Sequence, residues 1–218
     1  TKYNRRSIGM SINKDRIIAK HMPTIMMPAY EPLEKIEINR IRFIMGKDGL
    51  YLETRPPWGV LVKQVWKSPR LLPYGSVTEQ DTFIDALLSA KDIIRDIIIP
   101  EAAAFAREGK EWAGFITWQE KGYEYTKAKI TANSAMVEYE MPPLNNRSLA
   151  IDIHSHGVLR PFFSLTDDND DKGGIKVAVV LGNYNRNNGM DIFESVIRYC
   201  VEGFHFSPKG KGECVWKE

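Results

Sequence analysis

Helical periodicity is confined to one long stretch of this chain, and almost everything around it has the pattern of short β-strands. In DTFIDALLSAKDIIRDIII, residues 81–99, apolar side chains recur at the spacing of a helix face. Pro100 interrupts the pattern, and a second helical segment ends at Gly109. Thr78, three residues before Asp81, predicts a capped helix start there. Helices beside a mainly β chain predict an α+β (mixed α/β) fold, with the helices packed on a single sheet.

The first third of the chain has the pattern of a small β-rich region. Three short runs, IEINRIRFIM, GLYLET and WGVLVKQVW, are separated by the turn signals GKDG and Pro56-Pro57. Ahead of them, residues 1–30 are basic and irregular, which favours a loosely packed leader; contact of this arm with an acidic partner is the alternative. We therefore predict an N-terminal β-rich region with a basic leader over residues 1–76, and a second domain over 77–218.

After the helical stretch the chain alternates strands with turns. The runs WAGFITW, YEYTKAKITA, MVEYEM, SLAIDIHSH, IKVAVVLGNY and ESVIRYCVEGFHF are predicted as strands. The segment RPFFSLTDDNDDKGG between two of them is too polar for a core strand, and a short helix beginning at Ser164 is predicted inside it.

Composition argues against several classes of protein. Hydrophobic residues make up 43% of the 218 residues, enough for a packed core, and a net charge of +2 gives no reason to expect nucleic acid as a partner. No apolar stretch approaches the roughly 20 residues that span a bilayer, so no membrane partner is expected. The charged start TKYNRRSIGMS has no apolar run behind it and does not resemble a secretory signal. Cys200 and Cys214, without a CxxC pair, are expected to be free thiols in a reducing cytoplasm.

Two histidines at the end of a predicted strand are the strongest chemical signal. In SLAIDIHSH, His154 and His156 are two residues apart, so both imidazoles lie on one face of the strand. Two imidazoles can occupy two positions of a tetrahedral zinc site, and Asp167 could supply the third, which leaves the fourth for water. Three protein ligands and one open position are typical of catalytic zinc.

Ser164 and Asp167 fit a second, local pattern. Ser-x-x-Asp after Phe162-Phe163 predicts a helix N-cap with an acidic residue at the third helical position, where the helix dipole favours a carboxylate. A plain helix cap is the alternative interpretation of this pair taken alone. Composition predicts H-x-H-x7-S-x2-D by chance in roughly two of ten thousand such chains. That rarity favours a functional group over a plain cap.

The acidic residues that follow leave two further alternatives open. Asp168 replaces Asp167 as the ligand if the helix register differs by one. Asp168, Asp170 and Asp171 could bind a second cation, but the spacing of an EF-hand is absent. A solvated acidic helix face or turn is the favoured interpretation.

A hydrolytic zinc site also needs a proton-transferring base outside the metal ligands. Glu111 is the candidate, because it lies where the helical region ends and the strand WAGFITW begins. Other nearby glutamates are interpreted as solvated on the preceding helix (Glu101 and Glu108) or as flanking a turn (Glu120 and Glu124).

Together these residues resemble the signature of a known family. H-S-H-x7-S-x2-D is similar to the JAMM motif of the JAB/MPN metalloproteases, and the family's glutamate in E-x-x-G matches Glu111-Trp112-Ala113-Gly114. The helix over 81–109 is similar to the long helix before that strand, and the likeness covers about residues 80–205. The segments DIHSHG, FFSLTDDNDD, VVLGNY, RPPWGVLV and LPYG resemble, more closely, the bacterial subfamily known as protein A of PRTRC gene systems, over nearly the whole chain.

The resemblance implies a fold, a site and an activity. It implies a JAB/MPN-like (cytidine deaminase-like) β-sheet flanked by helices, with zinc held by His154, His156 and Asp167. Glu111 would be the general acid and base, and Ser164 would stabilise the tetrahedral oxyanion. Family members cut peptide or isopeptide bonds after the C-terminal glycine of ubiquitin or ubiquitin-like proteins. The implied partners are a ubiquitin-like protein or its conjugates, and E1-like and E2-like proteins of the same bacterial system.

Two other functions stay open at this level: a non-catalytic MPN-type binding scaffold, and a hydrolase of small adducts on a sulfur-carrier protein. GVLRPFF replaces the Pro-rich stretch that follows the second histidine in eukaryotic members. Little chain separates Asp167 from the strand IKVAVV, so there is little room for a long ubiquitin-gripping insertion. The substrate is therefore open between a protein conjugate, a precursor and a sulfur-carrier adduct.

Overall fold

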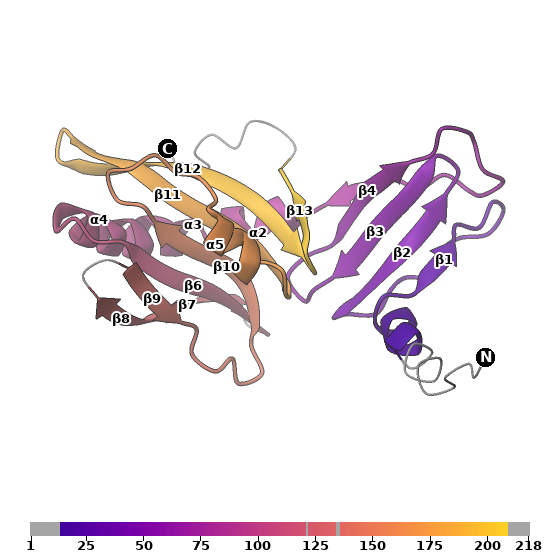
Figure 1. Cartoon of the computed structure of the whole chain (residues 1–218), viewed down its shortest axis with the longest axis horizontal. Coiled ribbons are helices and arrows are strands. Elements are labelled where there is room, and N and C mark those ends of the chain that lie inside the picture. The colour runs from indigo at the N-terminus through magenta and orange to yellow at the C-terminus, as the bar shows by residue number, and fades with distance from the viewer. Residues whose placement is uncertain (1–13, 121, 134–135, 209–218) are drawn as a thin grey trace, which may run out of the picture. The chain divides into compact units, whose positions relative to one another are not determined.

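The computed structural model describes residues 14–120, 122–133 and 136–208, and the chain divides into two compact units, Thr1–Thr82 (unit 1) and Phe83–Glu218 (unit 2) (Figure 1). Both units contain β-sheet and the helices are few, which confirms the predicted α+β class. Residues 77–82, assigned from the sequence to the second domain, lie in unit 1. Cys214 and the start of the leader lie outside the described residues. No helix of the described chain is both long and apolar enough to cross a bilayer.

Unit 1 is built on a five-stranded sheet with the order β1-β2-β3-β4-β5. From β2 to β5 each strand runs antiparallel to the next, whereas β1 runs parallel to β2. The prediction of an irregular leader over residues 1–30 was therefore wrong for its second half, since 14–21 are helical and β1 follows. The strands are β1 (Thr24–Met26), β2 (Arg40–Gly46), β3 (Gly49–Arg55), β4 (Leu61–Lys67) and β5 (Gln80–Asp81).

Unit 2 holds a six-stranded sheet with the order β13-β12-β11-β10-β6-β7, and a separate hairpin of β8 and β9. β10 and β11 are parallel neighbours, and the other neighbours are antiparallel. The run YEYTKAKITA was predicted as one strand but forms two, β7 and β8, in different sheets. The strands are β6 (Trp112–Gln119), β7 (Gly122–Lys127), β8 (Lys129–Asn133), β9 (Met136–Glu140), β10 (Ser148–Ser155), β11 (Ile175–Asn187), β12 (Met190–Val201) and β13 (Phe204–Phe206).

The long helical stretch differs from its prediction at both of its landmarks. It begins at Phe83, because Asp81 belongs to β5, where its carboxylate lies 3.3 Å from the buried Lys63 amine. Pro100 does not break it, because it lies in the first turn of α4, where a backbone N–H is not needed, directly after a π-helical segment. The helices of unit 2 are α2 (Phe83–Ser89), α3 (Lys91–Ile93), η1 (π-helical, Ile94–Ile98), α4 (Ile99–Arg107) and α5 (Leu165–Asp170).

The two faces of the unit 2 sheet carry different helices. Trp112 of β6 and Ser155 of β10 are paired across the strands, so their side chains share one face. Trp112 Nε1 donates to Glu101 of α4 at 3.2 Å, which identifies that face as the one covered by α4. His154 and His156 alternate with Ser155 and therefore point to the opposite face, where α5 lies (Figure 1).

Candidate metal centre

Strand β10 presents its residues alternately to the core and to the α5 side of the sheet. Ile151, Ile153 and Ser155 are fully buried, whereas His154 and His156 are only partly so. The backbone N–H of His156, just after β10, donates to Leu181 of β11 at 2.8 Å. Both histidines are therefore held by the sheet, with the shared orientation that period-2 geometry predicts.

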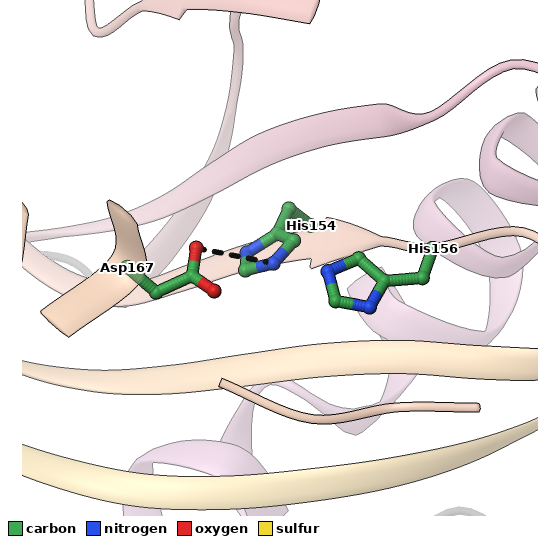
Figure 2. A group of neighbouring side chains, drawn as sticks. All are labelled: His154, His156 and Asp167. Atoms are coloured by element: carbon green, nitrogen blue, oxygen red, sulfur yellow. Dashed lines mark ion pairs between the residues drawn. The ribbon is translucent and has the colours of Figure 1, made fainter. Parts of the chain in front are cut away.

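The structure brings His154, His156 and Asp167 together. Each side chain offers one ligand atom, and these atoms all lie within 4.8 Å of one another. The two imidazole rings have centroids 5.2 Å apart, and Asp167 Oδ1 lies 3.5 Å from Nε2 of His154. Figure 2 shows the Asp167 carboxylate facing the His154 ring, with His156 just beyond the end of the same strand.

In the capping box at the start of α5, one carboxylate oxygen of Asp167 bonds the helix cap and the other faces His154. The Ser164 backbone N–H donates to Asp167 Oδ2 at 2.6 Å, and the Asp167 N–H donates to the Ser164 hydroxyl at 3.2 Å. The predicted cap at Ser164 is thus confirmed. Since Oδ2 is used by the cap, Oδ1 is the oxygen that faces His154. The plain cap and the functional interpretation of this pair are compatible, because they use different atoms.

Two observations on the histidines suit the binding of a cation: the lowered pKa of His154 and a buried ring nitrogen of His156. Burial lowers the pKa of His154, against the opposing charges of Asp167, Asp152 and Glu111, so its imidazole is neutral at neutral pH. The 3.5 Å contact to Asp167 is therefore one between a neutral ring and a carboxylate. Nδ1 of His156 is buried and makes no hydrogen bond within the described residues. Two imidazoles and a carboxylate form a donor set that zinc accepts.

Glu111 lies beside this group without belonging to it. It is exposed and directly precedes β6, whose first residue, Trp112, pairs with Ser155 between the two histidines. The Trp112 N–H donates to Ser155 Oγ at 3.2 Å, which fixes this end of β6 against β10. The negative charge of Glu111 acts on His154 and opposes the lowering of its pKa by burial, so the two groups are electrostatic neighbours. Glu111 therefore has the location expected of a base outside the metal ligands.

Of the other glutamates weighed from the sequence, Glu101, Glu108 and Glu124 have partners of their own. Glu101, predicted as solvated, instead accepts hydrogen bonds from Trp112 Nε1 and from the Tyr125 hydroxyl, the latter at 2.6 Å. Glu108 pairs with Lys110 on the surface. Glu124 accepts from the Gln119 amide, and Glu120 is exposed after β6.

The acidic run after Asp167 is solvated only in part: Asp170 is exposed and the Asp168 side chain is 43% exposed, whereas the prediction was wrong for Asp171. Asp171 is only 4% exposed, and its carboxylate is bound by Lys176 and Arg198. Burial alone would raise the pKa of Asp171, but hydrogen bonds from these two cations outweigh it and hold that pKa below its usual range. Asp168 pairs with Arg198 rather than facing a histidine.

A second group of metal-binding side chains is electrically unsuited to a cation. Asp171, Cys200 and His205 also offer atoms within 4.8 Å of one another. Lys176 and Arg198 already neutralise Asp171, and burial raises the pKa of the Cys200 thiol, which keeps it protonated. Cys200 is a buried free thiol, as predicted.

Sequence reasoning missed Asp152, Lys176 and Arg198, which lie close to the candidate centre. Asp152, His154 and Asp167 line one small polar pocket. A signal was present for each of the two cations, because Lys176 interrupts the apolar run IKVAVV and Arg198 interrupts VIRYCV. A charged residue inside an apolar strand is typical of a buried ion pair.

Comparison with known proteins bears on unit 1 only. Residues 12–83 match a family described as a domain of unknown function (DUF2016). This range covers less than half of the chain and contains none of the candidate metal-centre residues. A search of curated proteins finds no match to the chain.

Proposed function

We propose that this chain is a zinc-dependent peptidase or isopeptidase of the JAMM type, which removes or processes a ubiquitin-like protein at its C-terminus in a bacterial conjugation system. The observation that carries the proposal is the convergence of His154, His156 and Asp167, contributed by a strand end and a helix N-terminus. The family motif requires the same three residue types at this spacing. Glu111 and Ser164, the other two motif positions, lie at the same end of β10 and at the cap of α5.

In this proposal His154, His156 and Asp167 hold the zinc ion, which supplies a Lewis acid that makes water a nucleophile near neutral pH. Glu111 takes the proton from the attacking water and returns it to the amine that leaves. The Ser164 hydroxyl accepts the Asp167 N–H, so its own proton is available to a substrate carbonyl oxygen as negative charge develops there. The capping box holds Ser164 and Asp167 in a fixed relation during the reaction.

The substrate and its setting follow from the resemblance. A ubiquitin-like protein with a C-terminal extension or an isopeptide conjugate is the proposed substrate, with E1-like and E2-like proteins of the same system as further partners. A cytoplasmic location is part of the proposal, and the buried free thiol of Cys200 fits a reducing compartment.

A direct test incubates the purified chain with a C-terminally extended ubiquitin-like protein, with and without a zinc chelator. Mass spectrometry of the products should show loss of the extension only in the chelator-free sample. Glu111→Gln, which keeps the three metal ligands, is the matched control and should bind zinc without cleaving. Stoichiometric binding of the substrate without turnover by the zinc-loaded chain would instead support a binding scaffold.

One observation favours a second substrate class. Only residues 171–174 separate α5 from β11, so the described chain has no long insertion there to grip a folded protein. A small adduct on the C-terminus of a sulfur-carrier protein needs no such grip. The same mass measurement separates the two classes when both kinds of substrate are offered.

A further inference from the structure

Helix α5 positions Asp167 but has little apolar contact of its own. Within the described chain none of its six residues, Leu165–Asp170, is buried, and Leu165 is 82% exposed. Burial of an apolar face is what usually holds a helix of this length in place. α5 therefore depends on contacts made by the residues around its ends and by its own acidic side chains.

Arg198 of β12 makes several of these contacts. Its Nε and Nη2 donate to Asp171 Oδ2 at 2.9 and 2.6 Å, directly after the end of α5. Its Nη1 donates to Asp168 in the first turn. Its guanidinium carbon lies 3.8 Å from the ring centroid of Phe163, the residue before the N-cap Ser164. One side chain thus contacts α5 before its start, in its first turn and after its end.

Lys176 of β11 joins this network to the histidine strand. Its Nζ lies 2.6 Å from Asp171 Oδ1 and 2.6 Å from Asp152 Oδ2. Asp152 lies on β10 two residues before His154 and points to the same face. The side chains of Lys176 and Arg198 are each only 9% exposed and that of Asp171 only 5%, so water cannot readily replace the ion pairs that the two cations make with Asp171.

We propose that Arg198, supported by Lys176, is a positioning residue for Asp167: it holds α5 on the sheet so that the Asp167 carboxylate stays beside His154. This inference rests on the proposed metal centre. Arg198 is not in the ligand group itself and acts through the helix. The affinity of the centre for zinc therefore depends on a residue thirty-one positions away from its third ligand in sequence.

Whether zinc affinity rises or falls when Arg198 is removed distinguishes a positioning role from a purely electrostatic one. Arg198 is a cation near a site for a divalent cation, so by charge alone its removal would tighten zinc binding. Loss of the contacts that hold α5 lets the carboxylate move away from the histidines, which weakens binding. A fall in affinity on removal of a positive charge is thus specific to the positioning role.

Zinc affinity of the full chain, measured by competition with a chromogenic chelator well below the thermal transition, tests this. Arg198→Met should weaken binding roughly 10- to 100-fold, the range for residues that orient a metal ligand. Arg198→Lys keeps the positive charge but loses the planar guanidinium, so its zinc affinity should lie between those of the unaltered chain and Arg198→Met. Phe163→Leu removes the stacking partner with no change of charge and should also weaken binding. Cobalt(II) in place of zinc gives a second readout, because its visible absorption should change in the same variants as coordination by Asp167 is lost.

Arg107→Met is the matched control. Arg107, like Arg198, pairs with an aspartate: its Nη2 lies 2.7 and 2.9 Å from the two carboxylate oxygens of Asp191 in β12. Within the described residues its side-chain hydrogen bonds go to Asp191 and Tyr184, and none goes to α5. Its removal should leave zinc affinity and the cobalt spectrum unchanged. If Arg198→Met does not fold, Arg198→Lys and Phe163→Leu provide the result.

Equal or tighter zinc binding by the folded variants overturns the positioning role while leaving the metal centre intact. Absence of zinc binding by the unaltered chain overturns both this inference and the proposed function.

Discussion

At the scale of the residue, a proton-transferring carboxylate must lie close to the metal ligands without being one of them. Glu111 meets this condition, since it is exposed, precedes β6 and acts electrostatically on His154. Glu111→Gln should keep zinc and the fold but lower the rate of hydrolysis roughly 10²- to 10⁴-fold, the range for general acid–base catalysis. Single-turnover cleavage measured beside zinc content checks this. Cleavage at the unaltered rate would reject Glu111 as the base.

The lowered pKa of His154 predicts how the metal-free protein responds to pH. In the unfolded chain this histidine titrates near 6.5, whereas burial keeps it neutral to lower pH in the folded chain. As pH falls below about 6.5 the unfolded state gains a proton that the folded state does not, so the free energy of unfolding decreases, by at most about 1.4 kcal/mol per pH unit.

Urea unfolding of the metal-free chain at several pH values measures this decrease. His154→Gln removes the titrating group, so its free energy of unfolding should fall less over the same range. An identical pH dependence in both proteins would show that His154 is not the group responsible.

At the scale of the element, the backbone of the loop between His156 and Ser164 packs closely against Gly182 of β11. A Cβ at Gly182 would lie 2.4 Å from both the Leu159 carbonyl oxygen and the Pro161 nitrogen, which are backbone atoms. The Asn183 N–H donates to the same Leu159 oxygen at 2.7 Å, so the loop is tied at this point. The glycine in the motif VVLGNY therefore has a packing reason that the sequence alone does not reveal.

Gly182→Ala should consequently push the loop off β11, lower the free energy of unfolding by about 1–3 kcal/mol, and weaken zinc binding. Gly173→Ala is the control, since a Cβ there meets nothing within 4 Å. Chemical denaturation and chelator competition measure the two effects. Full zinc affinity in Gly182→Ala would mean that the position of this loop does not matter to the centre.

Two features of the candidate centre could be predicted from local sequence. The shared face of His154 and His156, and the capping box of Ser164 and Asp167, follow from rules that act over two or three residues. Both are present in the structure. The helix start was misplaced because Asp81 pairs with Lys63, a contact distant in sequence.

The network beneath α5 could not be predicted for the same reason. It requires knowing that β11 lies between β10 and β12, which places Lys176 opposite Cys200 and Arg198 opposite Ala178. Local spacing indicated solvated carboxylates, whereas long-range strand pairing places two cations against them. Local sequence patterns carry little information about which distant strands pair.

At the scale of the whole molecule, every candidate residue of the centre belongs to unit 2. Residues 83–218 expressed alone should therefore bind zinc with the affinity of the full chain. Chelator competition on the fragment and on the full chain compares them, with circular dichroism as the control for folding. A folded fragment that does not bind zinc would show that unit 1 contributes to the centre.

The zinc content of the purified full chain, compared with that of His156→Ala after dialysis against metal-free buffer, tests the central claim most directly. His156 has a buried ring nitrogen with no hydrogen bond among the described residues, so removing its imidazole should cost the centre a ligand without breaking a hydrogen bond of that nitrogen. Elemental analysis by mass spectrometry should find one zinc ion per unaltered chain and none in the variant. An unaltered chain without zinc, or equal zinc in both proteins, would contradict the account.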